Sequence, residues 1–365
     1  MWTLKKAWYR TFQCVFNLCE VFLPQPSPEL LEGAGSIKKL PAFIKTKGID
    51  KVLIVTDTVL PKLGLLNGLF EACDAAKLTY ELYDGAEVNP SIECIEAAYK
   101  KYCDNKCQGF IAFGGGSSMD CAKAAAARVA RPKRSIQQLG GTLKVLKKIP
   151  PLFAVPTTAG TGSEATLAAV VTDYSTHHKY AIQDPRLLPR YAVLDPELTV
   201  GLPPQVTSTT GMDALTHAVE AYTNKFAPKY TQRLAEEATK LIFENLEIAY
   251  TDGTNLEARD KMLHASLYAG RAFSRACVGN VHAIAHTLGG LYGTPHGLAN
   301  AVILPYVMED FGPAVYKKLA RLADIVGIKG DDEGEKARAF ILAIRQMNRD
   351  MNITEQFDNI KEEDI

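Results

Sequence analysis

The sequence has 365 residues, a formal net charge of zero at pH 7, 47% hydrophobic residues and 22% charged residues. This composition is typical of a globular protein, and the length suggests two domains that each bury a core. Because there is no broad basic field, we do not expect nucleic acid or an anionic membrane surface as a partner. The eight cysteines are scattered without a C-x-x-C pair, which favours free thiols in a reducing cytoplasm over a disulfide framework or a structural zinc site.

Residues 1–30 are predicted to be an amphipathic extension, with a helix over residues 4–23 that ends at a proline cluster. Early basic residues followed by an apolar run give this segment a superficial likeness to a signal peptide. Asn17 and Glu20 interrupt the run, however, and it is too short to span a bilayer. We therefore expect no transmembrane segment. We expect the helix to dock on the body of the protein, in preference to a partner subunit or a membrane surface.

Residues 31–202 alternate between strand patterns and helix patterns. The β-branched run KVLIVTD at 51–57 is a strand of buried type that ends in Asp57. After this strand, the patterns predict a helix in 61–77, a strand in 78–85 and a helix in 89–105. A strand, a glycine-rich turn and a helix follow in 109–130. The part ends with a strand and a small-residue loop in 150–165 and short strands in 180–204. This alternation predicts a largely parallel sheet with helices on its faces, and hence an α/β domain.

From residue 203 to residue 365 the pattern is helical. Apolar residues recur at three- and four-residue spacing in 207–224, 231–252, 256–276 and 313–328, and we find no convincing strand. We therefore expect an all-α second domain, and the candidate metal ligands all lie in it.

Those candidates come from two helical pairs and a turn. His282 and His286 are four residues apart and share a helix face, as do Asp213 and His217. Gly293 and Pro295 are expected to end the first of these helices before His296. Imidazole and carboxylate are the ligands of a divalent transition metal, and one helix can supply two of them. The alternative from the residues alone is that these are ordinary core or cap side chains.

Three features of the α/β part could hold a nucleotide. The turn GGGSS at 114–118 lies between a strand and a helix, where glycines allow close approach of a phosphate and the helix N-terminus offers free N–H groups. The loop PTTAGTGSE at 156–164 could line the same crevice, and Asp57 could accept hydrogen bonds from a ribose. The alternatives are a tight turn without ligand, a hydrogen-bonded loop with a cap at Ser163, and a turn aspartate.

Four collinear motifs, GGGSSMDCAKA, PTTAGTGSE, GMDALTHAVEAY and GNVHAIAHTLGGLYGTPHG, resemble those of the iron-containing (group III) alcohol dehydrogenases, which have a dehydroquinate-synthase-like fold. The likeness runs from about Leu31 to the end of the chain. It implies an N-terminal dinucleotide-binding α/β domain, an all-α C-terminal metal-binding domain and an active site between them.

The resemblance also implies roles for individual residues. By motif, the metal ligands are Asp213, His217, His282 and His296, and His286 is the catalytic histidine near the nicotinamide. The cofactor-side residues are Asp57, Asn89, Gly115, Gly116, Ser117, Asp120, Thr157, Thr158, Thr161 and Lys179. Phe273 and Ala168 fall at substrate-pocket positions, and Ala168 replaces a polar side chain of some relatives.

We therefore expect a metal-dependent, NAD(P)-linked alcohol dehydrogenase that passes hydride between nicotinamide and a small primary alcohol or aldehyde. Fe(II) is the expected metal, although Zn(II) would accept the same ligands, and Asp57 favours NAD(H) over NADP(H). A homodimer or larger homo-oligomer is expected, and the chain is expected to stop short of the family's usual C-terminus. The alternatives are a lyase that uses NAD transiently, disfavoured by few basic residues in 260–300, and a catalytically disabled nucleotide- or metal-binding protein.

Overall fold

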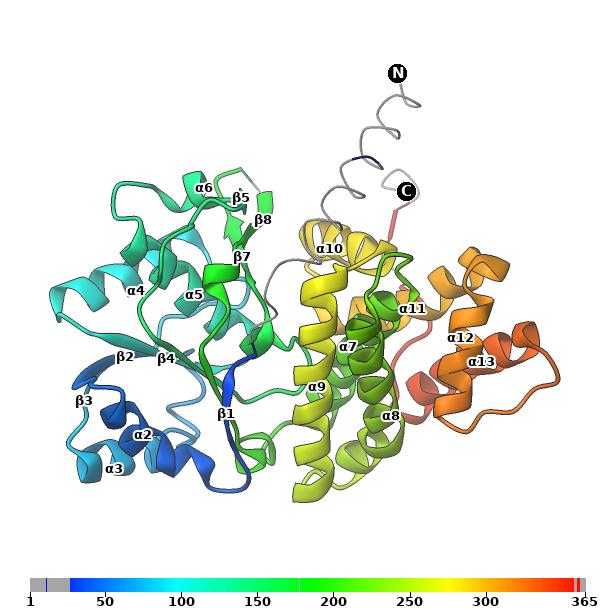
Figure 1. The fold of residues 1–365 in the computed structure, drawn as a ribbon, viewed down its shortest axis with the longest axis horizontal. Coiled ribbons are helices and arrows are strands. Elements are labelled where there is room, and N and C mark those ends of the chain that lie inside the picture. The colour runs from blue at the N-terminus through cyan, green and yellow to red at the C-terminus, as the bar shows by residue number, and fades with distance from the viewer. Residues whose placement is uncertain (1–10, 12–26, 177, 358–359, 362–365) are drawn as a thin grey trace.

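A computed structural model describes residue 11, residues 27–176, residues 178–357, and residues 360 and 361. A sheet with helices on its faces lies beside a helical part, and the chain passes from the first to the second near residue 200 (Figure 1). The fold class predicted from the sequence is thereby confirmed. The helix expected over residues 4–23 falls, apart from residue 11, outside the described residues.

The main sheet has six strands in the order β1-β9-β6-β4-β2-β3, and all of its pairs are parallel. Its strands are β1 (Glu29–Glu32), β2 (Lys51–Val55), β3 (Thr79–Tyr83), β4 (Gly109–Gly114), β6 (Leu152–Pro156) and β9 (Tyr191–Leu194). Every residue of β4, β6 and β9 is buried, as expected for strands covered on both faces. The predicted parallel sheet is therefore present, while the short edge strand β1 was not predicted.

Alternate residues of the central strands enter two different cores. In β2, Leu53 and Val55 belong to one hydrophobic cluster, and Val52 and Ile54 belong to the other. Helices α4 and α5 cover the first face, and η1, α2 and α3 cover the second. These helices are η1 (Ser36–Lys39), α2 (Leu40–Thr46), α3 (Asn67–Ala76), α4 (Ile92–Asp104) and α5 (Gly116–Ala130). The two-residue period of the strands thus decides which helices each side chain meets.

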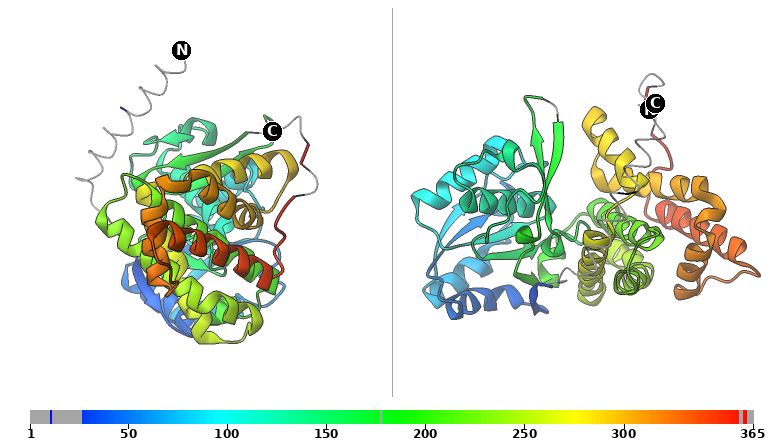
Figure 2. Two further views of the ribbon diagram at one scale, coloured as in Figure 1. Left: turned by 90° about the vertical axis from the view of Figure 1, so that its right-hand side faces the viewer. Right: turned by 45° about the horizontal axis from the view of Figure 1, so that its top comes forward.

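A smaller sheet, in the order β5-β8-β7, stands beside the main one. Its strands are β5 (Gly141–Thr142), β7 (Ala168–Asp173) and β8 (His178–Gln183), and β7 and β8 form an antiparallel pair. Short helical turns flank these strands: α6 (Ile136–Leu139), η2 (Ser163–Ala165), η3 (Pro185–Leu187) and η4 (Pro196–Thr199). In Figure 1 and in the right-hand view of Figure 2, this pair lies on the side of the α/β part that faces α10.

The described residues after 203 form helices and no strand, which confirms the all-helical second part. The helices are α7 (Pro204–Thr223), α8 (Lys229–Thr251), α9 (Leu256–Ala276), α10 (Asn280–Tyr292), α11 (His296–Phe311), η5 (Gly312–Ala314), α12 (Tyr316–Ile325) and α13 (Glu333–Asp350). Helices α7, α8 and α9 pack side by side (Figure 1). Among the helices of the described residues, none combines the length and the apolar composition needed to cross a membrane.

The two parts meet where the loop before η2 contacts helix α9. Gly162 has a φ of +58°, and a Cβ built on it would lie 2.6 Å from the Cα of Gly270. A Cβ built on Gly270 would lie 2.6 Å from the carbonyl oxygen of Gly162. Two backbones therefore approach here without side chains between them, and Ser266 Oγ accepts a hydrogen bond from the Gly162 N–H at 3.1 Å. The contact fixes the 156–164 loop against the helical part.

We expect Gly270→Ala to lower the free energy of unfolding by about 1–3 kcal/mol, because overpacking against rigid backbone outweighs the gain in helix propensity. The matched control is Gly290→Ala in α10, where a Cβ meets nothing within 4 Å. That change should raise stability by roughly 0.5–1 kcal/mol through helix propensity alone. Urea unfolding followed by circular dichroism measures both. A Gly270→Ala protein as stable as the control would contradict the close contact.

Candidate active site

Three helices bring the four expected metal ligands together. Asp213 and His217 lie on α7, His282 lies on α10 and His296 begins α11. One ligand atom from each residue lies within 4.8 Å of the others. Asp213 Oδ1 is 3.5 Å from His296 Nε2 and 3.9 Å from His282 Nε2. All but His296 are buried.

The protonation states of this cluster suit a cation. Burial lowers the pKa of His217 to about 3 and also lowers the pKa of His296. Burial opposes ionisation of Asp213, but the three neighbouring imidazoles and a hydrogen bond from Asn300 outweigh it, and the pKa of Asp213 is lowered. Neutral imidazoles and one ionised carboxylate are a donor set for a divalent transition metal. The residues present therefore fit a metal ion held between α7, α10 and α11.

The break between α10 and α11 places the last ligand. Helix α10 ends at Tyr292, and Gly293 follows in the left-handed conformation with a φ of +67°. Pro295 then precedes α11, so His296 is its first residue. The break predicted from glycine and proline is present. Because the chain reverses there, His296 returns to the face of α10 that carries His282, with ring centroids 5.3 Å apart.

His286 lies beside the cluster and outside it. Its ring centroid is 5.1 Å from that of His296 and 6.1 Å from that of His282, and its side chain is exposed. It is not among the four converging ligands. An imidazole one helical turn from a metal ligand, with access to solvent, is placed to exchange protons with a group bound nearby.

Asn300 is a residue of the cluster that the sequence analysis did not single out. It is fully buried on α11, four residues after His296. Its Nδ2 donates to Asp213 Oδ1 at 2.7 Å and lies 3.1 Å from Nε2 of both His282 and His296. The amide thus holds the Asp213 carboxylate in place. The i, i+4 spacing from a histidine was the available signal, but asparagine is too common in helices for that spacing to select it.

The two expected substrate-pocket residues have different surroundings. The Phe273 ring stacks on His217, with centroids 4.1 Å apart and planes 15° apart. Ala168 begins strand β7, and its carbonyl oxygen accepts a hydrogen bond from Lys123 at 3.0 Å. Phe273 is therefore in contact with the metal cluster through His217. The substrate-pocket assignment of both residues stays a prediction.

Three of the residues expected on the cofactor side lie at the carboxyl ends of neighbouring strands. Asp57 follows β2, Gly115 follows β4 and Thr157 follows β6, and these three strands are adjacent in the sheet. The chain leaves β2 on one side for β3 and returns on the other for β4, so the strand order reverses between β2 and β4. Ligands of open α/β sheets bind at such a reversal. Asp57 also holds a turn, since its Oδ1 accepts from the N–H groups of Val59 and Leu60.

The glycine-rich turn packs directly against the hydroxyl loop. A Cβ built on Gly116 would lie 2.7 Å from Thr161 Cγ2, and one built on Gly115 would lie 3.4 Å from Thr158 Oγ1. Helix α5 begins at Gly116 without a side-chain cap, so its first N–H groups are available to a ligand. Ser117 lies in this first turn. The structure thus places a helix N-terminus and threonine hydroxyls together, as an anion site requires.

Three further residues expected on the cofactor side, Asn89, Lys179 and Asp120, each make hydrogen bonds in this region. The Asn89 N–H donates to Ser117 Oγ at 3.3 Å, and Lys179 Nζ donates to Asn89 Oδ1 at 2.7 Å. Asn89 has a φ of +58°, a conformation that asparagine tolerates better than most residues. Asp120 accepts from Ser163 Oγ at 2.8 Å. Burial raises the pKa of Asp120, and it lies on α5 facing the hydroxyl loop.

Two buried ionisable groups near this loop were not predicted. Lys123 on α5 is fully buried, and its Nζ donates to oxygens of Ser163, Thr166 and Ala168. Burial lowers the pKa of Lys123 to about 8 and raises that of Glu164 to about 7. Among the described residues, neither carboxyl oxygen of Glu164 has a hydrogen-bond partner. Lys123 therefore connects α5 to the 156–164 loop and to β7. The buried carboxyl group of Glu164 destabilises the fold, because it has no hydrogen bonds within the described part of the chain.

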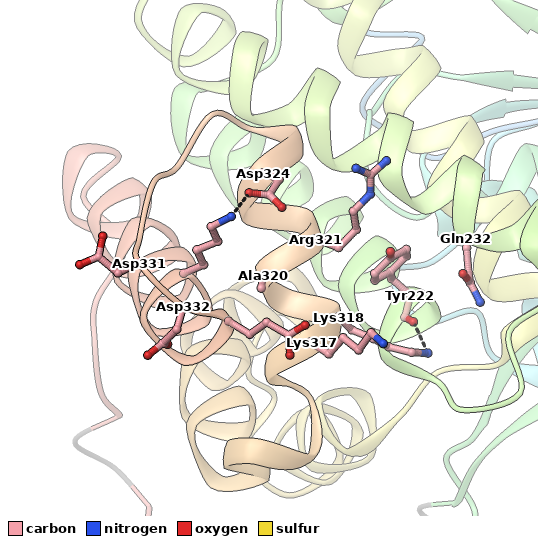
Figure 3. A pocket seen from close by; sticks show the side chains of 11 residues that line it. Tyr222, Gln232, Lys317, Lys318, Ala320, Arg321, Asp324, Asp331 and Asp332 are labelled. Carbon is pink, nitrogen blue, oxygen red and sulfur yellow. Dashed lines mark hydrogen bonds and ion pairs between the residues drawn. The ribbon is translucent and has the colours of Figure 1, made fainter.

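A separate hollow of about 800 Å³ lies on α12 and the start of α13, where Lys318 donates to the carbonyl oxygen of Tyr222 and Lys336 pairs with Asp324 (Figure 3). None of the residues discussed above as ligands or cofactor contacts lines it. The metal cluster and the sheet edge therefore remain the candidate active site.

Comparisons with known proteins agree with this geometry. Two family models match, iron-containing alcohol dehydrogenase over residues 27–196 and Fe-containing alcohol dehydrogenase family, C-terminal, over residues 207–365. Alcohol dehydrogenase 4 of Schizosaccharomyces pombe is 39% identical, covering 88% of this chain and 76% of that protein. The 1,3-propanediol dehydrogenase of Klebsiella pneumoniae is 39% identical, covering 87% and 84%. A crystal structure of 1,3-propanediol oxidoreductase matches with a TM-score of 0.90 at 36% identity, covering 94% and 91%.

A parallel α/β sheet followed by a helical part, with one aspartate and three histidines converging on a candidate metal site, defines an α/β protein with a helical, metal-binding second part. The chain belongs to the iron-containing alcohol dehydrogenase family, whose members are oxidoreductases acting on alcohols and aldehydes.

The buried Glu164 gives a prediction for pH dependence. Its pKa is about 7 in the folded chain against an ordinary value of 4.5, so the folded state holds the proton more tightly. The contribution of this proton to the free energy of unfolding is fully present below pH 4.5. It is lost as the pH rises through 7, which lowers the free energy of unfolding by up to about 3 kcal/mol. Glu164→Gln should remove that loss, so the variant should lose less stability than the parent between pH 5 and pH 8. Urea unfolding at both pH values measures it, with Glu71→Gln on the exposed side of α3 as control. An unchanged pH dependence in Glu164→Gln would contradict the burial of a carboxyl group without hydrogen bonds to the described residues.

Proposed function

We propose that this chain is a metal-dependent, NAD-linked alcohol dehydrogenase and aldehyde reductase for small primary alcohols and aldehydes. The observation that carries the proposal is the convergence of Asp213, His217, His282 and His296, of which all but His296 are buried, in a chain of this family. A ligand set of this kind leaves coordination positions open for a substrate oxygen, as catalytic metal sites do.

Asp213, His217, His282 and His296 would hold the metal, and Fe(II) is the proposed ion. The family's name supports iron, while the ligand chemistry would equally admit zinc. When bound, the metal supplies Lewis acidity that favours an alkoxide over an alcohol or polarises an aldehyde carbonyl. Within the chain, Asn300 holds the Asp213 carboxylate and Phe273 stacks on the His217 ring. These contacts keep two ligands in fixed orientations.

His286 is proposed to move the proton that accompanies hydride transfer. Its ring lies about one turn beyond His282 on α10, near His296, and is open to solvent. A neutral imidazole there can accept a proton from the substrate side and release it to water.

NAD(H) is the proposed hydride carrier. We place its pyrophosphate at the Gly115–Ser117 turn, against Thr157, Thr158 and Thr161, with Asn89, Asp120 and Lys179 fixing the surrounding loops. Two similar proteins support the choice, a NAD-dependent methanol dehydrogenase of Bacillus methanolicus at 36% identity and a sulfoacetaldehyde reductase of Bifidobacterium kashiwanohense solved with NAD+ at 30% identity. The Asp57 carboxylate would repel the 2′-phosphate of NADP(H).

Two broader features belong to the same proposal. The free cysteines among the described residues are consistent with work in the reducing cytoplasm. The family resemblance supports assembly as a homodimer or larger homo-oligomer, which sedimentation of the purified chain would test.

Metal removal gives the direct test. Anaerobically purified protein should oxidise NADH with butanal, lose that activity to a chelator and regain it with Fe(II). His282→Ala should lower kcat/KM by more than about 100-fold, because a ligand is lost. His264→Ala in α9 is the matched control, since His264 lies outside the cluster and contacts Glu32 and Asp260.

Near-normal turnover in His282→Ala with full metal content would overturn the ligand assignment. Bound metal with NADH binding and no turnover of any aldehyde would instead favour the lyase or the disabled protein.

Cofactor choice gives a second test. Asp57→Asn keeps a side-chain oxygen for the turn at Val59 and Leu60 but removes the charge. Removing a repulsion of about 1 kcal/mol should lower KM for NADPH relative to KM for NADH by roughly fivefold. Steady-state kinetics with both coenzymes measures this ratio, and Asp74→Asn on the exposed side of α3 is the control. A ratio equal to that of the control would contradict the placement of Asp57 at the ribose.

A further inference from the structure

Glu220 is a buried carboxylate on α7 that touches the metal cluster without belonging to it. It lies three residues after His217 and seven after Asp213, so all three side chains share one face of the helix. It is 5% exposed, and it is not one of the four converging ligands. Such a burial is unfavourable unless the carboxylate is fully hydrogen-bonded.

Three N–H groups from a single segment satisfy it. Glu220 Oε2 accepts from the Gly279 backbone N–H at 2.9 Å and lies 2.6 Å from His282 Nδ1. Its Oε1 accepts from the Val281 backbone N–H at 2.7 Å. The two backbone donors belong to the N-cap residue Gly279 and to the first turn of α10, where N–H groups have no partner within the helix. One carboxylate therefore caps α10 and holds the ring of the ligand that α10 carries.

The contact with His282 determines which ring nitrogen bears the proton. An ionised carboxylate can only accept, so Nδ1 must be the protonated nitrogen. The lone pair is then on Nε2, which is the nitrogen that faces Asp213 and His296. The opposite tautomer would place a proton on Nε2 and prevent metal binding. A hydrogen bond from the ligand's second nitrogen to a carboxylate also makes the first nitrogen a stronger donor.

The backbone at the start of α10 is shaped to admit this carboxylate. A Cβ built on Gly279 would lie 2.8 Å from Glu220 Oε1. Any larger residue at 279 would push the carboxylate away from the α10 N-terminus. The small residue and the buried acid therefore form one arrangement, although they lie 59 residues apart.

We propose that Glu220 is a positioning residue that fixes the tautomer and orientation of His282 and so prepares the site for its metal. The proposal rests on the proposed function, because it takes His282 as a ligand. Glu220 thereby strengthens metal retention, and it tempers the Lewis acidity of the bound ion.

The test measures metal affinity and not only turnover. Metal-free protein is titrated with Zn(II) in competition with a chromophoric chelator, and the melting temperature of the metal-free protein is recorded alongside. In Glu220→Gln the side chain has no charge and only one acceptor oxygen for the three N–H groups that contact Glu220. At least one of these N–H groups then faces the amide NH2 group, which cannot accept a hydrogen bond. We expect its Zn(II) affinity to fall by about 10–100-fold, and that of Glu220→Ala to fall at least as far.

Two further variants separate positioning from general stability. Gly279→Ala keeps the carboxylate but displaces it, and it should lower Zn(II) affinity in the same direction. Glu236→Gln is the matched control, because Glu236 on α8 is bonded to Tyr222 and Arg321 away from the cluster, and its affinity should be unchanged. Absorption of the Co(II)-loaded proteins should show an altered ligand field in the Glu220 variants and not in the control.

The outcomes are distinct. Zn(II) affinity in Glu220→Gln equal to that of the parent, with only a lower melting temperature, would show a helix cap and overturn the proposal. If the parent itself binds no metal, the proposed function fails first, and with it the basis of this inference. Reduced affinity and an altered Co(II) spectrum, together with the lower melting temperature that loss of the α10 cap brings, is the expected result.

Discussion

The structure depends on holding one carboxylate and three imidazoles together inside a helical core. Such groups are unfavourable in a low-dielectric interior unless each finds a partner. Asn300 bonds to Asp213 and Glu220 bonds to His282, and the four candidate ligand atoms lie close enough together to share a cation. Three helices must meet for this to happen. That requirement explains the turn between α10 and α11, which brings His296 back beside His282.

The part of the site where we propose that the cofactor binds depends on a different constraint, which is the close approach of the turn after β4 to the loop after β6. The turn after β4 and the loop after β6 contain glycines and small hydroxyl residues because larger side chains would fill the space between them. Lys123 and Asp120 of α5 hold this loop through hydrogen bonds to Ser163. The same loop reaches α9 through the contact of Gly162 with Gly270. A single loop therefore touches both the turn proposed to bind the nucleotide and the helical part that carries the four candidate ligands, and in the proposed function this contact would keep hydride donor and acceptor in register.

Buried ionisable groups are concentrated in the same region. Burial moves the pKa of Lys123 down and those of Glu164 and Asp120 up, so these groups lie closer to neutrality than their exposed counterparts. Apolar side chains in these places would avoid the cost of burying charge, but they would not fix one arrangement of the loop. The hydrogen bonds of Lys123 to Ser163, Thr166 and Ala168 are directional, and they specify where the loop and β7 sit.

The sequence by itself determined the features that have local causes. Apolar periodicity indicated the parallel sheet and the helical second part, and glycine with proline indicated the break before His296. The i, i+4 pairs, with the family resemblance, indicated Asp213, His217, His282 and His296. Strands β1 and β7 were not predicted from the sequence. Strand β1 is a four-residue edge strand that is defined by its pairing with β9, and β7 is defined by its pairing with β8. The sequence also did not predict the roles of Asn300, Glu220 and Lys123, because the role of a buried polar residue depends on partners that are distant in the chain. Only the tertiary structure could decide those contacts, because hydrogen bonds between remote elements leave no periodic trace in the sequence.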